Sequence, residues 1–193
     1  LASISKRPIQ RGEQPEYVEE RGVRVIKTVN LKDAYIDHDG CPRVTEEYFL
    51  QYPDAHVLKG DVLISSTGYV SMGKVDVYDR DDPAMVDGHI SILRLVEGYD
   101  PYFVAYFLRS HLGKLQFEKW WTGSSGQIEL QPTDLRKFVI PDNTQNGIPL
   151  NRQKEIAGKI SQVSTRITQL ERNKNLFCAK ANERFAELLG IAV

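Results

Sequence analysis

WWTGSSGQIELQPTDLRKFVIPDN (residues 120–143) and IPLNRQKEIAGKI (residues 148–160) are the two stretches that decide the fold of this chain. The first predicts a loop of small residues, a short apolar strand at Phe138–Ile140 that ends at Pro141, and a polar connector. The second begins a helix with Asn151 as its N-cap. We therefore expect a globular domain at residues 1–149 and a long helix at residues 150–193.

The helix is predicted to run to about Leu189, because Gly158 is the only Gly or Pro inside it. About 39 residues at 1.5 Å each give a rod of roughly 58 Å. Its apolar residues recur in alternating steps of four and three, which is typical of a coiled-coil seam. The seam needs a second helix, from another chain or from a part of this protein outside the sequence. We expect the contacts from Ile156, Ile160, Val163, Ile167, Leu170, Phe177 and Leu188.

Composition indicates an ordinary folded protein. Of the 193 residues, 41% are hydrophobic and 26% are charged, which is enough for a packed core. No run of 18 apolar residues is present to span a membrane. Cys41 and Cys178 have no CxxC neighbour, so we expect free thiols in a reducing cytoplasm. The four histidines share no ligand spacing, so we expect no metal.

The net charge of −1 hides a segregation along the chain. Residues 1–32 carry +3, residues 33–100 carry −9 and residues 101–193 carry +5. Such asymmetry permits a basic face on a nearly neutral protein. A solvated acidic middle with no functional meaning is the alternative, and charge alone favours it.

The globular part shows both strand and helix signals. Strands are predicted at residues 23–29, 34–36, 62–64, 70–77 and 90–95. At Gly73 the apolar alternation shifts by one residue, which indicates a β-bulge. Helices are predicted at Thr45–Leu50 and after the cap Asp100-Pro101, the second burying Phe103, Val104, Phe107, Leu108, Leu112 and Leu115. The pattern predicts an α+β fold with a mixed sheet, followed by one long coiled-coil-type helix.

Motifs of enzymes are missing from the sequence. It contains no GxGxxG, GxxxxGK[ST], GxSxG or HExxH motif, so it offers no basis for a nucleotide site, a nucleophile elbow or a zinc protease. The acidic turn Asp79–Asp82 lacks the spacing of a calcium loop and is expected to be solvated. We therefore expect neither catalysis nor a bound cofactor.

Two small-residue loops carry the chemistry that remains: residues 65–68 (SSTG) and residues 122–127 (TGSSGQ). Hydroxyls and backbone N–H groups in such loops can hold phosphate oxygens. Lys74 follows the first loop, and Lys114 and Lys119 precede the second. Tyr69, Trp120 and Trp121 offer rings for stacking on a sugar or base. The alternative is that both loops are plain turns and the two tryptophans cap the core.

Five segments together resemble a target-recognition domain from the specificity subunit of type I restriction-modification systems. They are residues 60–75 (GDVLISSTGYVSMGKV), 87–95 (DGHISILRL), 102–110 (YFVAYFLRS), 122–141 (TGSSGQIELQPTDLRKFVIP) and 150–160 (LNRQKEIAGKI). Their order and spacing match that family across nearly the whole chain. The last two segments are the most specific.

The resemblance implies a DNA target-recognition domain that reads one half of a bipartite site in double-stranded DNA. The helix would space it from a second such domain and dock methyltransferase subunits, with a restriction subunit as a further partner. An N6-adenine methyltransferase partner would use S-adenosylmethionine, and this chain would not bind it.

Full members carry two recognition domains and two helices, whereas this chain has one of each. It is therefore a half-sized subunit that forms a homodimer, a fragment, or the recognition tail of a fused adenine methyltransferase. A protein-binding adaptor without DNA contacts is a rival that the low net charge favours.

Base-reading residues vary among members of that family, so chemistry must choose the candidates here. Polar side chains near the basic strand and the two loops are suited to base edges. Hydroxyls and lysines are suited to phosphates. We predict base contacts from Lys27, Asn30, Tyr69, Lys74 and Gln127, and phosphate contacts from Ser65, Ser66, Thr67, Lys119, Ser124 and Ser125.

Overall fold

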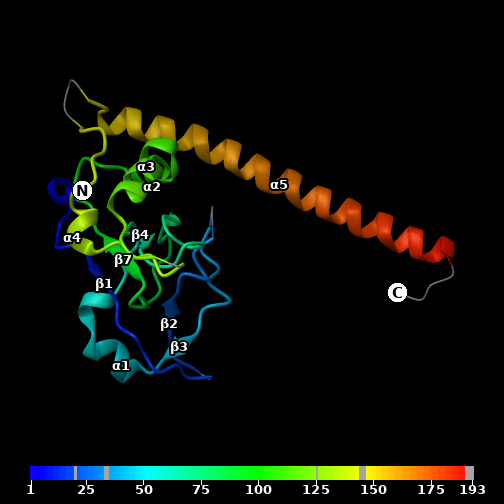
Figure 1. Ribbon diagram of the computed structural model, residues 1–193, viewed down its shortest axis with the longest axis horizontal. Coiled ribbons are helices and arrows are strands. Elements are labelled where there is room, and N and C mark those ends of the chain that lie inside the picture. The colour runs from blue at the N-terminus through cyan, green and yellow to red at the C-terminus, as the bar shows by residue number, and fades with distance from the viewer. Residues whose placement is uncertain (20, 33–34, 125, 144–146, 190–193) are drawn as a thin grey trace. The chain divides into compact units, whose positions relative to one another are not determined.

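The computed structural model describes residues 1–193 except residues 20, 33–34, 125, 144–146 and 190–193 (Figure 1). The chain divides into two compact units, Leu1–Glu155 and Ile156–Val193. The first holds two β-sheets and most of the helices, and the second belongs to one long helix. This confirms the predicted α+β class with a long C-terminal helix. In the described part of the chain, no helix has both the length and the apolar character that crossing a membrane requires.

A four-stranded antiparallel sheet in the order β1-β7-β4-β5 runs through the first unit. Its strands are β1 (Gln10–Arg11), β4 (Val62–Ser65), β5 (Val75–Val77) and β7 (Ile90–Leu93). In β4 and β7 every residue is buried, since α2 packs against β4 and β5 and Leu63, Ile90 and Ile92 join the main core cluster. Burial of the whole strand explains the continuous apolar runs in the sequence.

A second sheet, in the order β3-β2-β6, is mixed. Strand β2 (Val23–Ile26) runs antiparallel to β3 (Arg43–Val44) and parallel to β6 (Ala84–Val86). The chain crosses from β6 to β7, and so from one sheet to the other, through Asp87, Gly88 and His89. Gly12 passes close to this crossing: its N–H donates to the Asp87 carbonyl at 3.1 Å, and a Cβ there would lie 1.8 Å from the Val86 oxygen.

The remaining elements of the first unit are short helices. They are η1 (Ala2–Ile4), α1 (Glu46–Gln51), η2 (Pro53–Ala55), α2 (Pro101–Arg109), α3 (His111–Trp120) and α4 (Pro132–Leu135). Two predicted caps are confirmed. The Thr45 hydroxyl accepts from the Tyr48 N–H at 3.1 Å, and the Asp100 carboxylate accepts from the Phe103 N–H at 2.8 Å.

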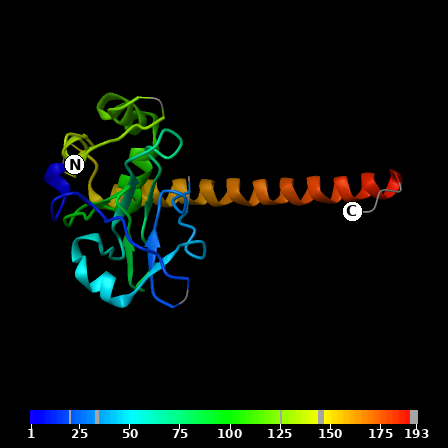
Figure 2. The same ribbon diagram turned by 60° about the horizontal axis from the view of Figure 1, so that its bottom comes forward.

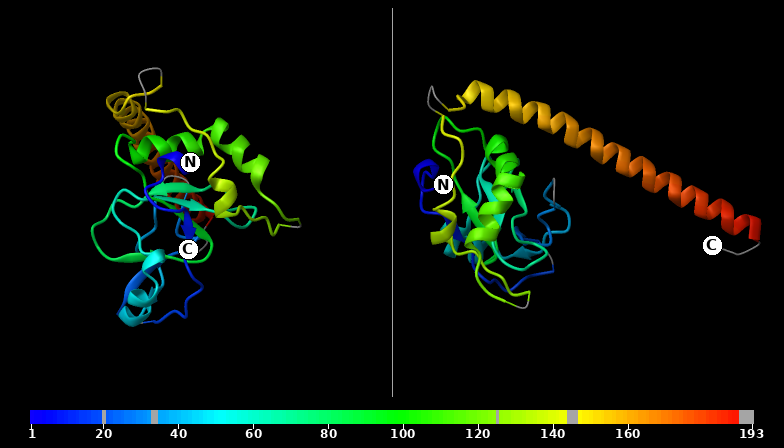
Figure 3. Two further views of the ribbon diagram at one scale, coloured as in Figure 1. Left: turned by 90° about the vertical axis from the view of Figure 1, so that its left-hand side faces the viewer. Right: turned by 45° about the horizontal axis from the view of Figure 1, so that its top comes forward.

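The predicted single helix after Asp100 is in fact two, α2 and α3, which Figure 3 shows as separate segments. Ser110 leaves the helical conformation with ψ at 169° and caps α3 by accepting from the Gly113 N–H. Only glycine fits at 113, because a Cβ would lie 2.0 Å from the Leu108 carbonyl oxygen. The break rotates the apolar stripe, so the predicted core residues Leu112 and Leu115 are exposed by 59% and 46%.

Two other strand predictions were wrong. Residues 69–73 form a turn rather than a bulged strand, and Val70 is 84% exposed. Residues 138–140 form no strand, because their pairing partner is a side chain. The Gln116 amide accepts from the Val139 N–H at 2.6 Å and donates to the Val139 carbonyl at 2.9 Å. The predicted strand at residues 34–36 begins at a residue outside the described ones.

Helix α5 (Leu150–Leu189) is continuous over 40 residues (Figure 2), close to the predicted bounds. Inside the first unit, the fully buried Gln153 fixes its first turn. The Gln153 amide accepts from the Asp100 N–H at 2.9 Å and donates to the Ile148 carbonyl at 2.8 Å. Farther along, the predicted seam is open: Val163 is 60% exposed and Phe177 is 74% exposed.

One buried ion pair ties β7 to the turn before β4. The Arg94 guanidinium donates to both carboxylate oxygens of Asp61, at 2.8 and 2.7 Å. Asp61 is 1% exposed and also accepts from the Leu58 N–H. The hydrogen bond to Asp61 raises the pKa of Arg94. Without the Asp61 charge, the half-buried Arg94 guanidinium would lose its counter-ion.

We predict that Asp61→Asn lowers the free energy of unfolding by about 3 kcal/mol, since removing one partner of a buried pair leaves an uncompensated charge. Urea denaturation followed by circular dichroism measures this. Asp81→Asn removes the same charge from the exposed Lys59–Asp81 pair and is the matched control, expected to leave the midpoint unchanged. Equal effects of the two substitutions would contradict the role given to Asp61.

Candidate nucleic-acid interface

The two small-residue loops that the sequence singled out lie side by side, joined by backbone hydrogen bonds. The Gly68 N–H donates to the Ile128 carbonyl at 2.9 Å, the Tyr69 N–H to Gly126 at 3.3 Å, and the Leu130 N–H to Ser66 at 2.9 Å. We call residues 66–74 and 122–130 together the double loop. Because backbone bonds hold both halves, side chains on its surface can vary without loss of the framework.

The second half of the double loop is also closed on itself. Thr122 and Glu129 exchange two backbone hydrogen bonds, each of 2.8 Å. Gly123 has a φ of 107°, and a Cβ there would lie 2.3 Å from the Gln127 carbonyl oxygen. This position therefore requires glycine.

Several predicted contact residues are at the surface of this region. Tyr69 is 72% exposed, Lys119, Ser124 and Gln127 are exposed, and Thr67 and Lys74 are half-buried. Lys27 lies outside the double loop, at the end of β2, with its ammonium 4.6 Å from the centroid of the Tyr17 ring.

Three predicted contact residues are interior and have structural roles. Asn30 is 2% exposed and its side chain accepts from the Lys27 N–H. Ser65 and Ser66 are completely buried, and the Ser66 hydroxyl shares a 2.7 Å hydrogen bond with Ser91. Their side chains cannot reach phosphate in this fold. Backbone N–H groups of this loop, which we expected to be open, are largely used internally. Ser125 lies outside the described residues.

A polar cavity of about 530 Å³ lies beside the double loop and contains residues that the sequence did not reveal. Arg11 of β1 forms an ion pair with Glu129 and donates to the Leu130 carbonyl. The hydrogen bond from Arg11 lowers the pKa of the Glu129 carboxyl. His89, Thr67 and Gln127 also line this cavity. Arg11 was missed because its segment has no periodic pattern, and His89 because its neighbours come from distant segments.

Asp87 links this cavity to the second sheet. It is fully buried, one carboxylate oxygen accepts from the His89 N–H at 3.0 Å, and the other has no partner. Burial raises the pKa of Asp87, an effect that the His89 N–H and the charges of His89 and Lys27 oppose. The electrostatic influence of Lys27 places that predicted residue near the same crossing.

Basic side chains gather along α3 and α4. The ammonium groups of Lys119 and Lys137 lie 4.9 and 4.4 Å from the centroid of the Trp120 ring. Arg136 follows α4 and shares a cavity of about 230 Å³ with Lys6 and Arg7. The acidic residues 79–82, by contrast, form ion pairs with Arg24, His38 and Lys59. Lys137 also forms an ion pair with Asp134. We call Lys119, Arg136 and Lys137, which are all exposed, the basic surface.

The structure also bears on metal binding and on the two cysteine thiols. Within the described ranges, no group of three or more His, Cys, Asp or Glu residues is arranged to hold a metal ion. Both cysteines are free, Cys41 buried and Cys178 exposed. Burial raises the pKa of Cys41 to about 11, which makes its thiol unreactive at neutral pH.

Comparison with known proteins assigns the family. Residues 3–176 match the type I restriction modification DNA specificity domain. The chain belongs to this family. It is 24% identical over 178 residues to the specificity subunit of the type I restriction enzyme EcoBI from Escherichia coli, which covers 89% of the chain and 35% of that protein.

Two solved structures share the fold of this specificity domain. The first, from work on complex assembly and conformational transition of the type I R-M system, has a TM-score of 0.64 at 18% identity, covering 95% of this chain and 42% of that one. The second is the type I S subunit of M. genitalium, with a TM-score of 0.58 at 18% identity, covering 96% and 44%. The chain thus spans less than half the length of these relatives.

We predict that stability responds to the pH through Asp87. Because burial raises its pKa in the folded state, the folded state disfavours the carboxylate, and the contribution of Asp87 to the free energy of unfolding falls as the pH rises from its ordinary pKa of 3.8 through its raised pKa in the folded state. Asp87→Asn should remove this part of the pH dependence. From pH 4 upward, the free energy of unfolding of the parent should therefore fall relative to that of the variant. Urea denaturation at a series of pH values tests this. If the free energies of unfolding of parent and variant change with pH in parallel, the ionisation of Asp87 does not destabilise the folded state.

Proposed function

We propose that this chain is a DNA target-recognition domain of a type I specificity subunit. It reads part of a specific sequence in double-stranded DNA and directs an adenine methyltransferase, and with it a restriction subunit, to that sequence. It performs no catalysis itself, binds no S-adenosylmethionine, and acts in the cytoplasm, where the DNA is. The observation that carries this proposal is the family match over residues 3–176.

The double loop supports the proposal because it combines rigidity with exposed, varied side chains. Tyr69, Ser124 and Gln127 project from a framework that backbone hydrogen bonds hold. A glutamine amide can pair with adenine in the major groove, and a hydroxyl can bond to a phosphate or a base. We assign base reading to Tyr69 and Gln127, and a phosphate contact to Thr67.

The basic surface supplies the phosphate contacts in this proposal. Lys119 on α3 is exposed, as are Arg136 and Lys137 beside α4. Three such contacts would make the logarithm of the affinity fall with that of the salt concentration with a slope of about −2.7. Because the net charge of the protein is −1, a slope of this size would show that its basic side chains are concentrated at the DNA-binding surface.

We predict that selection from a random duplex library with the purified chain yields one preferred half-site, and that binding to it weakens steeply with salt. Lys119→Ala should weaken binding to all duplexes alike and reduce the slope by about 1. Lys59→Ala, in the acidic region, is the matched control and should change neither. A flat salt dependence without sequence preference would favour the protein-binding adaptor.

Gln127→Ala should act differently from Lys119→Ala. Loss of a base contact costs about 1–3 kcal/mol at one position of the site and relaxes the preference there. Ser124→Ala, next to it in the same loop, should reduce affinity without relaxing any position. Repeating the selection with each variant measures this, and an unchanged preference with Gln127→Ala would remove that residue from the reading set.

We further propose that residues 150–193 form the spacer and partner helix, paired along the seam. The exposure of Val163, Ile167, Leu170 and Phe177 supports this, because an apolar stripe along a helix is stable only when covered. A second recognition half, in the same parent protein or a second copy, would supply the facing helix.

Replacing Ile160 and Ile167 by Asp should abolish self-association or methyltransferase docking while the first unit remains folded. Ser161→Asp with Gln169→Asp places the same charges off the seam and is the control. Sedimentation velocity reports the assembly and circular dichroism the fold. An unchanged assembly in the seam variant would show that the helix pairs along another face.

A further inference from the structure

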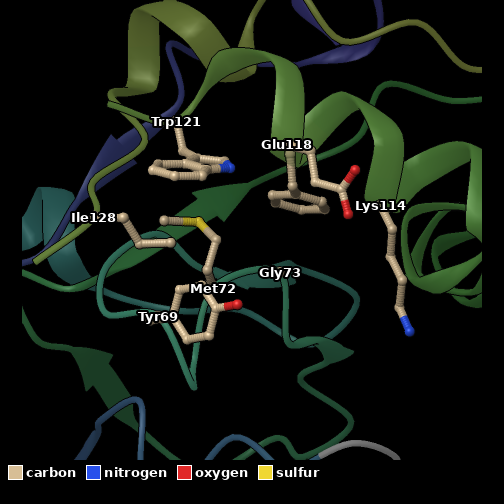
Figure 4. A pocket seen from close by; sticks show the side chains of 8 residues that line it. Tyr69, Met72, Gly73, Lys114, Glu118, Trp121 and Ile128 are labelled. Carbon is tan, nitrogen blue, oxygen red and sulfur yellow. The ribbon is translucent and has the colours of Figure 1, made fainter. Parts of the chain in front are cut away.

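A second cavity, of about 600 Å³, opens against α3 beside the exposed ring of Tyr69. Its walls are mainly apolar and aromatic. Figure 4 shows the rings of Trp121 and Tyr69 on opposite sides of the Met72 and Ile128 side chains. We call it the aromatic cavity. A volume of this size is in the range of cavities that hold a small planar molecule.

Core packing holds one wall of the cavity. Gly73, with a φ of 76°, packs so closely that a Cβ would lie 3.2 Å from the Phe117 ring. Phe117 in turn packs edge to face on Phe138, with 4.9 Å between ring centroids. A ligand would therefore meet one fixed aromatic wall, and the exposed Tyr69, Lys114 and Glu118 side chains on the border would close around it.

Two charged groups from α3 lie at its border, Lys114 and Glu118 (Figure 4). The Glu118 carboxylate repels phosphate, so the border of the cavity next to Lys114 is not a phosphate site. The carboxylate is well suited to accept a hydrogen bond from an exocyclic amino group, as acidic side chains do from cytosine N4. The Lys114 ammonium can donate to a ring nitrogen or a carbonyl. The pair thus matches the edge of a base with an exocyclic amino group better than that of thymine, which has none.

We propose that the aromatic cavity receives one unstacked nucleobase that carries an exocyclic amino group, such as cytosine or adenine, from the bound DNA. The flat faces of a base inside a duplex are covered by its neighbours, so aromatic walls can stack only on a base that has left the helix. Tyr69 belongs both to the double loop and to this cavity. The inference rests on the proposed function, because it requires DNA at the double loop.

The test uses the purified chain and a fluorescently labelled duplex of the selected half-site. Each base in turn is placed opposite an abasic site, so that it no longer has a pairing partner, and anisotropy titrations give the affinities. At one position, an orphaned adenine or cytosine should bind about tenfold tighter than the matched duplex, because the protein no longer has to break the pair. An orphaned thymine there should gain less.

Trp121→Ala should reduce that gain to less than about twofold, since base stacking on an aromatic ring is lost. Trp121→Phe keeps an aromatic face and should retain the gain, which separates lost stacking from misfolding. Tyr102→Ala removes an exposed ring of α2 that does not line the cavity. This variant should also retain the gain in affinity. Glu118→Ala should erase the preference for adenine and cytosine over thymine.

The outcomes separate this inference from the proposed function. If the matched duplex binds but no orphaned base gives a gain, or if the gain persists in Trp121→Ala, the inference is overturned and DNA recognition stands. If no duplex raises the anisotropy, both are overturned.

Discussion

Three backbone hydrogen bonds between residues 66–69 and 126–130 are the constraint on which the candidate DNA-reading surface depends. They join a loop between two sheet strands to a loop that follows α3. Arg11 completes the junction from β1 through Glu129 and the Leu130 carbonyl. Exposed side chains such as those of Tyr69, Ser124 and Gln127 make none of these main-chain bonds, so they can be changed without breaking the junction. That property suits a reader of varied DNA sequences.

Charge is organised around the same junction. In the acidic turn, Asp82 and Asp81 form ion pairs with Arg24 and Lys59, and Asp79 lies 3.6 Å from the His38 ring. The lysines of α3 and α4 are arranged about Trp120. A nearly neutral chain can therefore present a basic face without excess positive charge elsewhere, which would promote non-specific binding to nucleic acid.

Sequence patterns predicted the elements whose signals are local. The caps Thr45 and Asp100, the buried strands β4 and β7 and the extent of α5 follow from neighbouring residues. The break at Ser110 was missed because it depends on the close approach of Gly113 to Leu108, and the strand at Phe138–Ile140 failed because the Gln116 side chain takes its hydrogen bonds. In the site, the two loops were recognisable by composition. Two features of the site could not be predicted, because they arise from tertiary packing. One is the burial of Ser65, Ser66 and Asn30, and the other is the position of Arg11 and His89, which come from distant segments.

We propose that the double loop reads the DNA. Photochemical cross-linking of the chain to its selected duplex carrying 5-bromouracil, with the cross-linked peptides identified by mass spectrometry, tests this. Cross-links are expected within residues 66–74 and 122–130, and unlabelled duplex of the same sequence should compete for them. Cross-links confined to the acidic residues 79–82 or to α1, with none in the double loop, would contradict it.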